Sequence, residues 1–197
     1  MAPVPAPSAQ VRALSYTSAT PRICWTDASG AARFIAAVVT GPRGTFFVRA
    51  FVPNWIWDQL LPRQDHQIGV QEALGVWLLV CSFRRLLGSC LVTIYVDNDG
   101  VTAAYINGSS NSPEVNAMVA VFWLFVARHQ MHPIFYRVES KANLADGPTR
   151  PDELGCSILS QIGAVEFPPY LPGWLLNLWH PFAHDVLTRE DILLGLD

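Results

Sequence analysis

Apolar residues follow two different spacings along this chain, and the change between them separates predicted strands from predicted helices. The first part holds three β-branched or aromatic runs joined by short turns, one of which is Gly41-Pro42-Arg43-Gly44. Such runs predict an antiparallel meander. They span residues 23–26, 31–39 and 45–52. From Ile68 to Leu87 the apolar residues instead recur at helical spacing, and Gly88 ends the pattern.

The second part alternates strands with helices. The run 91–96 predicts a buried strand that ends in Asp97. A short helix over 101–106 follows, with Asp99 as its expected cap. Ser112 and Pro113 then open a second helix that reaches residue 130 and is apolar nearly all round, so we expect it to be covered. A strand over 133–138, a loop over 139–143 and a helical turn over 144–148 complete the order β-β-β-α-β-α-α-β-α. This order predicts an α/β fold with a mixed five-stranded sheet, an antiparallel meander plus parallel strands, flanked by helices.

The two ends of the chain differ in amino-acid composition from the middle. Residues 1–21 are rich in Pro, Ala, Ser and Thr and are typical of a linker or flexible arm. We expect one domain over 22–150 and an extension rich in Pro and Trp over 151–197, packed or facing a partner. In that extension we predict a helix over 152–165, no regular structure over 167–174 and a terminal helix from Thr188.

Composition limits the classes of function. Only 15% of the 197 residues are charged and 51% are apolar, which suggests that a partner or more of a larger protein covers some apolar surface. The net charge of −3 argues against a strongly basic nucleic-acid binder but allows local basic patches. The four cysteines match neither a zinc site nor a disulfide framework and indicate buried or incidental thiols in a reducing compartment. No apolar run is long enough for a membrane span and no secretory signal is apparent, so we expect an intracellular location, cytoplasmic or nuclear, and no membrane partner.

Four acidic residues stand at informative places. Asp27 lies on the first strand, Glu72 on the long helix, Asp97 at the tip of the fourth strand, and Asp146 in the turn after the fifth. Taken alone, Asp97 is as well explained as a helix cap, and Glu72 as a residue favoured by the helix dipole. If the first and fourth strands are neighbours, however, these carboxylates converge and repel one another, and Mg²⁺ or Mn²⁺ would relieve that repulsion. Two such ions about 4 Å apart can support phosphodiester hydrolysis.

Several stretches also resemble a known family, the ribonuclease H domains of retroelements, found beside the reverse transcriptases of LTR and DIRS-like elements. The resemblance covers about residues 22–150, and its most specific motif is Asn143-Leu144-Ala145-Asp146 with the closing Arg150. The other matching pieces are Trp25-Thr26-Asp27-Ala28-Ser29-Gly30, the helical Glu72, Tyr95-Val96-Asp97-Asn98 and 103–107.

The resemblance implies a fold, an activity and a site. The fold would be ribonuclease H-like, and the activity would be endonucleolytic hydrolysis of the RNA strand of RNA–DNA hybrids. Two Mg²⁺ ions, replaceable by Mn²⁺, would be held by Asp27, Glu72, Asp97 and Asp146, which would form both the metal and the catalytic site. The partners would be the hybrid and the reverse transcriptase domain of the same polyprotein. Cations able to meet phosphate are sparse: Arg33, Arg43, Arg84, Arg85, Arg137, Lys141 and Arg150.

Some features depart from the family, and alternatives stay open. The loop 139–144 lacks the histidine of many cellular relatives, and no basic helical protrusion follows Glu72. His129 and His132 are interpreted as structural. His180, His184 and Asp185 could mimic a metal cluster, although a packed tail is favoured.

The main alternative function is a catalytically weak or inactive ribonuclease H-like module that serves a structural role in a larger assembly. A resolvase or integrase on the same fold is less favoured because of the 143–146 motif.

Overall fold

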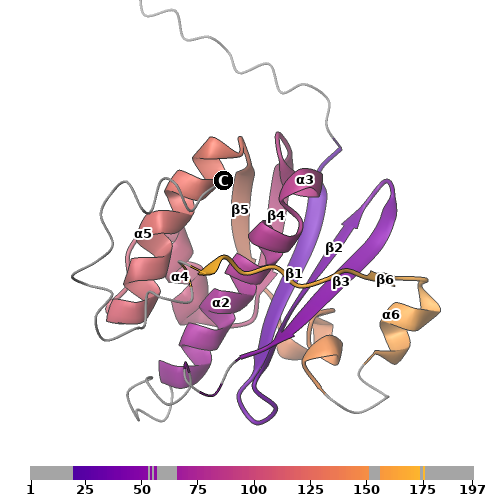
Figure 1. Ribbon diagram of the computed structural model, residues 1–197, viewed down its shortest axis with the longest axis horizontal. Coiled ribbons are helices and arrows are strands. Elements are labelled where there is room, and N and C mark those ends of the chain that lie inside the picture. The colour runs from indigo at the N-terminus through magenta and orange to yellow at the C-terminus, as the bar shows by residue number, and fades with distance from the viewer. Residues whose placement is uncertain are drawn as a thin grey trace, which may run out of the picture.

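A six-stranded mixed sheet with the strand order β5-β4-β1-β2-β3-β6 forms the centre of the protein (Figure 1). The computed structural model describes residues 20–52, 54, 56, 66–150, 156–173 and 175. The strands are β1 (Arg22–Ser29), β2 (Phe34–Gly41), β3 (Gly44–Phe51), β4 (Leu91–Val96), β5 (His132–Arg137) and β6 (Val165–Glu166). The first three form the predicted antiparallel meander, and β4 and β5 continue the sheet in parallel with β1. The mixed α/β sheet is therefore confirmed, with one strand more than predicted.

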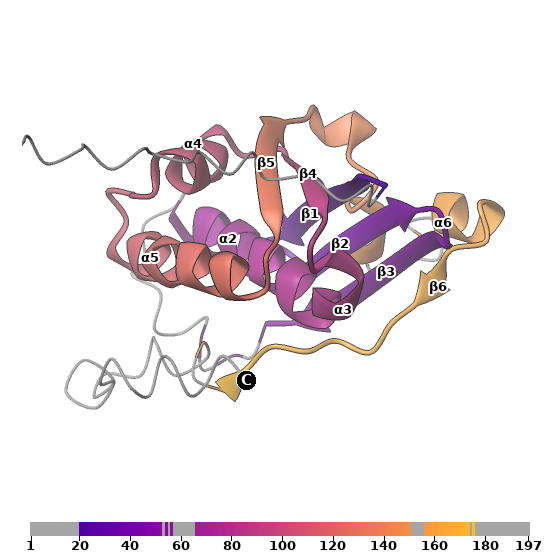
Figure 2. The same ribbon diagram turned by 90° about the horizontal axis from the view of Figure 1, so that it is seen from above.

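Helices cover one face of this sheet. They are α2 (His66–Ser82), α3 (Arg84–Leu87), α4 (Asp99–Asn107) and α5 (Pro113–Arg128). The described part also contains α6 (Ser157–Gln161), which packs through Leu159 on the opposite face, and the 3₁₀ turns η1 (Ser140–Ala142) and η2 (Gly147–Thr149). Figure 2 shows α2 and α5 side by side on one face. There Trp77 of α2 packs edge to face against Phe122 and Phe125 of α5. The inward residues of the strands, such as Cys24 and Ile94, are fully buried in the same core. No helix in the described ranges combines the length and the apolar character that a membrane span needs.

The opposite face is covered only in part. A small second core there joins Val38 and Phe47 of the meander to Ala145 and Leu159. The side chains of β4 and β5 on this face stay open, and Ile134 and Tyr136 are 42% and 51% exposed. The 140–150 segment therefore lies over β1 and β2 and leaves the β5 edge uncovered.

The extension after residue 155 differs from the prediction. In place of one helix over 152–165, the described part has the short α6, a turn at Gly163 with φ +67°, and the strand β6. Helical spacing alone could not reveal that β6 would pair with the free edge of β3. Of the stretch 167–174 that was predicted to be irregular, residues 167–172 have no regular structure and cross the helix side of the sheet (Figure 1), whereas Gly173 is helical. The predicted helix from Thr188 lies outside the described residues, and so do His180, His184 and Asp185.

Phe167 and Tyr170 fasten this crossing segment. The Phe167 ring packs against Phe46 of β3 and Phe83 at the end of α2, with ring centroids 5.4 Å apart in both cases. The Tyr170 backbone N–H donates to Ser82 Oγ at 2.9 Å, and the same hydroxyl lies 3.3 Å from the Tyr170 carbonyl. The extension is thus tied to the core of the domain.

Four smaller predictions need correction. The helix over 68–87 is interrupted at Phe83, which separates α2 from α3. Asp99 does not cap α4, because Asn98 takes that position and its Oδ1 accepts from the Val101 N–H at 3.0 Å. The helix α5 is not covered all round, since Leu124 is 55% exposed. Finally, Gly147 and Pro148 begin η2 rather than end a helical turn, as Pro favours the first turn of a helix.

Candidate functional site

Asp27 and Asp97 lie at the point where two parallel strands separate. The pairing of β1 with β4 ends at Trp25 and Tyr95. Because side chains alternate along a strand, the residues two positions further on, Asp27 and Asp97, project from the same face of the sheet as these two aromatic residues. Carboxyl ends of adjacent parallel strands are a common place for ligand sites in open α/β sheets. Asp27 is only 5% exposed, and Asp97 is partly buried.

Glu72 reaches the same place from α2. It is the seventh residue of that helix and thus lies beyond the first turn, so the helix dipole alone does not explain it. One turn further on, Gly75 lets α2 lie close to β1, since a Cβ there would stand 3.3 Å from the Asp27 carbonyl oxygen and 3.6 Å from Thr26 Cβ. Glu72 is 5% exposed, and Asn98 hydrogen-bonds to its carboxylate.

The 140–150 segment supplies Asp146 and a hydrogen-bond donor to three of the four carboxylates. Ser140 Oγ donates to Asp97 Oδ2 at 2.8 Å. Thr149 Oγ1 lies 3.0 Å from Asp27 Oδ2 and 2.8 Å from the Asp146 carbonyl oxygen. Arg150 Nη2 donates to Asp146 Oδ1 at 2.7 Å. One short segment therefore fixes the carboxylates of two strands and its own aspartate.

Asn143 anchors this segment to β1. Its buried amide nitrogen donates to the Thr26 carbonyl at 2.9 Å and lies 3.4 Å from Asp27 Oδ1. Its Oδ1 accepts from the Ala145 N–H at 3.1 Å. The asparagine of the 143–146 motif thus closes the turn that carries Asp146 and at the same time orients Asp27.

The carboxylates influence one another strongly. Burial, and then the charge of Asp97, raise the pKa of Glu72 from 4.5 to about 9. The same two causes, in the same order, raise the pKa of Asp27 from 3.8 to about 7, while the Thr149 hydroxyl opposes the rise and Asp146 adds to it. The structure therefore brings all four predicted acidic residues into one electrostatic cluster.

The donor set of this cluster fits a hard divalent cation. Two buried carboxylate oxygens, Glu72 Oε2 and Asp97 Oδ1, receive no hydrogen bond from any other donor of the described residues. The proton that the raised pKa keeps on Glu72 is shared with Asp97. Oxygen atoms of this kind, beside carboxylates that cannot all ionise unaided, are what Mg²⁺ or Mn²⁺ would coordinate. No three Asp, Glu, His or Cys side chains in the described ranges form a ready-made metal-binding group.

The predicted phosphate-binding cations divide between the two ends of the sheet. Arg33, Arg137, Lys141 and Arg150 lie at the carboxylate end, since Arg33 follows β1, Arg137 ends β5, and the other two belong to the 140–150 segment. Arg137 is paired there with Asp99 at 2.8 Å, and both side chains are exposed. Arg43 lies in the β2–β3 turn and Arg84 and Arg85 form the start of α3, all at the opposite end. The structure therefore does not gather all seven cations around the acidic residues.

Sequence reasoning missed the residues that support the carboxylates. Asn98, Ser140 and Thr149 are common polar residues in predicted turns and caps, and only their position next to an acidic residue or inside a matched motif marks them.

Comparisons of the chain with protein-family models, with curated proteins and with solved structures gave no match. The functional assignment therefore depends on the site itself.

Proposed function

We propose that this protein is a metal-dependent endonuclease of the ribonuclease H type, which hydrolyses the RNA strand of RNA–DNA hybrids. The observation that carries the proposal is the cluster of Asp27, Glu72, Asp97 and Asp146, with two buried oxygens that receive no hydrogen bond from any other donor of the described residues. A structural role alone gives no reason to hold these mutually repelling groups together.

The architecture supports the same proposal. An antiparallel meander continued by two strands parallel to β1, with the acidic residues where β1 and β4 separate, is compatible with the ribonuclease H-like fold that the motifs imply. The resemblance also places such a domain beside a reverse transcriptase. We include that partner in the proposal.

Each carboxylate has its own role in the proposed reaction. Asp27 and Asp97 would hold the ions most directly, Asp146 would support one of them, and Glu72 would orient the second ion and the attacking water. Two bound Mg²⁺ ions would supply activation of water and stabilisation of the leaving oxygen. Asn143, Ser140 and Thr149 keep Asp27 and Asp97 aimed at the cluster. Lys141 at the same end would approach the phosphate backbone of the hybrid.

The direct test is cleavage of an end-labelled RNA–DNA hybrid by the full chain with Mg²⁺. We expect cleavage of the RNA strand only, its loss in Asp97→Asn, and its retention in Asp99→Asn, which removes a neighbouring exposed charge outside the cluster. Duplex DNA and single-stranded RNA serve as substrate controls. Absence of metal-dependent cleavage by the wild-type chain would contradict the proposal.

A structural module of the same fold is the second candidate, favoured by the open side of the sheet. Trp25, Tyr95 and Tyr136 form a row across β1, β4 and β5, with neighbouring ring centroids 5.8 and 5.9 Å apart. With the exposed Ile134 they make an apolar surface next to the acidic residues. Calorimetric titration with Mn²⁺ separates the two candidates, because a purely structural module predicts no binding that depends on Asp27.

A further inference from the structure

The outer side of α5 carries an exposed apolar face. Leu124 and Trp123 are 55% and 36% exposed there, and Ala120 and Ala127 lie at the surface beside them. Figure 1 shows α5 at the margin of the helix layer, with α2 on its inner side. Scattered apolar residues are common on protein surfaces, whereas a continuous uncharged face on a well-packed helix is typical of an interface.

The residues of this face follow the spacing of a helix pair. Successive members are three, four and three positions apart, which is the alternation of positions a and d in a heptad repeat. The core-facing side of α5 is already filled, so this second series points away from the core. A helix with a second apolar side is expected to bury it against a further helix. The series consists of Ala117, Ala120, Leu124 and Ala127.

This face is complementary to itself when two copies of α5 run antiparallel. A two-fold axis at residue 122 brings Leu124 of each copy against Ala120 of the other, so that a large side chain fills the space beside a small one. Trp123 then lies next to its own symmetry mate. A parallel pair would instead place Leu124 on Leu124 and alanine on alanine, which fills the alanine layers poorly.

The charges at the two ends of α5 favour the same arrangement. Glu114 in the first turn and Arg128 in the last are the charged residues of this helix, and they occupy the same heptad position beside the apolar series. In the antiparallel pair Glu114 of each copy meets Arg128 of the other, whereas a parallel pair would bring like charges together.

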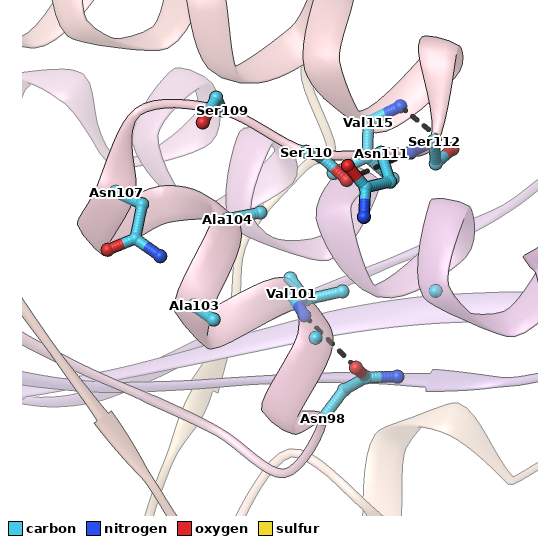
Figure 3. Close-up of a pocket in the computed structure, with 12 residues that line it drawn as sticks. Asn98, Val101, Ala103, Ala104, Asn107, Ser109, Ser110, Asn111, Ser112 and Val115 are labelled. Atoms are coloured by element: carbon cyan, nitrogen blue, oxygen red, sulfur yellow. Dashed lines mark hydrogen bonds between the residues drawn. The ribbon is translucent and has the colours of Figure 1, made fainter.

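Ser112 holds Glu114 in place at the start of α5. The Ser112 hydroxyl donates to the Glu114 carboxylate at 2.8 Å. It also accepts from the Val115 N–H at 3.4 Å, the bond drawn between these two residues in Figure 3. The acidic end of the face is therefore ordered before any second chain arrives, which lowers the entropy cost of an ion pair there.

We propose that two copies of this chain associate through α5 as an antiparallel, two-fold symmetric helix pair. The pairing is independent of the proposed nuclease function. It uses the helix side of the domain, whereas the 140–150 segment that holds the carboxylates lies over the opposite face, so both candidate sites stay accessible. Because two helices of 16 residues form a small interface, we expect a Kd on the order of 10 μM.

Sedimentation equilibrium of the full chain from about 1 to about 200 μM measures the association. We expect the wild type to pass from monomer to dimer over this range. Leu124→Glu should raise the Kd by at least about 10-fold, because it places unpaired carboxylates inside the interface. Ile158→Glu is the matched control, since Ile158 on α6 is 58% exposed, like Leu124, and lies outside the α5 face. Its Kd should stay within about 2-fold of the wild-type value.

A charge exchange tests the orientation of the pair. Glu114→Lys and Arg128→Glu should each weaken the dimer by about 5-fold or more, because each variant faces its own copy with like charges at both ends. An equimolar mixture of the two variants should restore association, since opposite charges then meet at both ends. Restored association also shows that both variants are folded.

Three results would overturn the proposal. A wild-type chain that stays monomeric throughout the concentration range would assign the α5 face to a different protein. A dimer that Leu124→Glu leaves intact would place the interface elsewhere. A mixture of the charge variants that associates no better than its components would exclude the antiparallel pair.

Discussion

Replacing Asp97 by asparagine should stabilise the metal-free protein while it removes metal binding. Asp97 is the second cause, after burial, of the raised pKa values of both Asp27 and Glu72. The amide introduced by Asp97→Asn would keep an oxygen that can accept from Ser140 but would carry no charge. The mutual repulsion in the cluster would therefore fall without the loss of its main hydrogen bond.

The magnitude follows from Asp27. Its pKa rises from 3.8 to about 7, which corresponds to on the order of 4 kcal/mol of lost stability once the group is ionised in the native state. Because burial accounts for the largest part, we assign to Asp97 on the order of 1–2 kcal/mol. A carboxyl whose native pKa is raised weakens the fold at pH values above its unfolded pKa, and the loss is complete above the native pKa. The gain in Asp97→Asn should consequently be largest near pH 8 and small near pH 4.

Urea unfolding of the metal-free chain at pH 8 and pH 4 measures this effect, and Mn²⁺ calorimetry measures the accompanying loss of binding, which we expect to be at least about 10-fold. Asp99→Asn is the control. It removes an adjacent aspartate whose ion pair with Arg137 is exposed, and it should change stability by no more than about 0.5 kcal/mol. A destabilised Asp97→Asn chain at pH 8, or one that binds Mn²⁺ like the wild type, would refute the reasoning.

Three further measurements test contacts of the same site and of the extension. The metal-free wild type should lose on the order of 2 kcal/mol of unfolding free energy per pH unit between pH 5 and 7, because the native state keeps protons on Asp27 and Glu72 that the unfolded chain releases; a stability that rises with pH in urea titrations would contradict this. Thr149→Val should weaken Mn²⁺ binding and cost about 1–3 kcal/mol, since buried Asp27 loses a hydrogen-bond donor while the side-chain shape is kept; calorimetry and urea unfolding check both effects, and unchanged binding would count against it. Phe167→Ala should lower the free energy of unfolding by about 2–3 kcal/mol, because it removes the ring packed on Phe46 and Phe83. Thermal unfolding measures this loss, and an unchanged stability would show that the extension does not stabilise the domain.

The sequence predicted the sheet well because its signals are local. Short glycine-containing turns separate β1, β2 and β3, and the β4 run ends abruptly at Asp97. That β1 and β4 are neighbours was the one long-range assumption, and their parallel pairing confirms it. Once those strands are adjacent, alternation of side chains largely determines that Asp27 and Asp97 meet.

Other features depend on contacts that no local pattern encodes. The two residues of β6 form a strand only because β3 offers a free edge, and Phe167 has a place only between two distant aromatic rings. The donors of the 140–150 segment are equally non-local, since Asn143 meets Thr26 across more than a hundred residues. The cap of α4 was misplaced by one residue because Asn98 and Asp99 are both good cap residues. Asp99, which does not cap the helix, pairs instead with Arg137 of β5.

The distribution of compensating groups around the acidic residues gives the strongest physical reason to expect a cation there. Asp146 has Arg150, and Asp27 has neutral donors from Asn143 and Thr149. By contrast, buried oxygens of Glu72 and Asp97 receive no hydrogen bond from any other donor of the described residues. A cluster with only a structural role would be more stable with a neutral side chain at either position, because an unpartnered buried carboxylate is costly. In the metal-free protein the raised pKa of Glu72 keeps its carboxyl protonated near neutral pH. A divalent ion would displace that proton and supply the positive charge that the two carboxylates lack when substrate is bound.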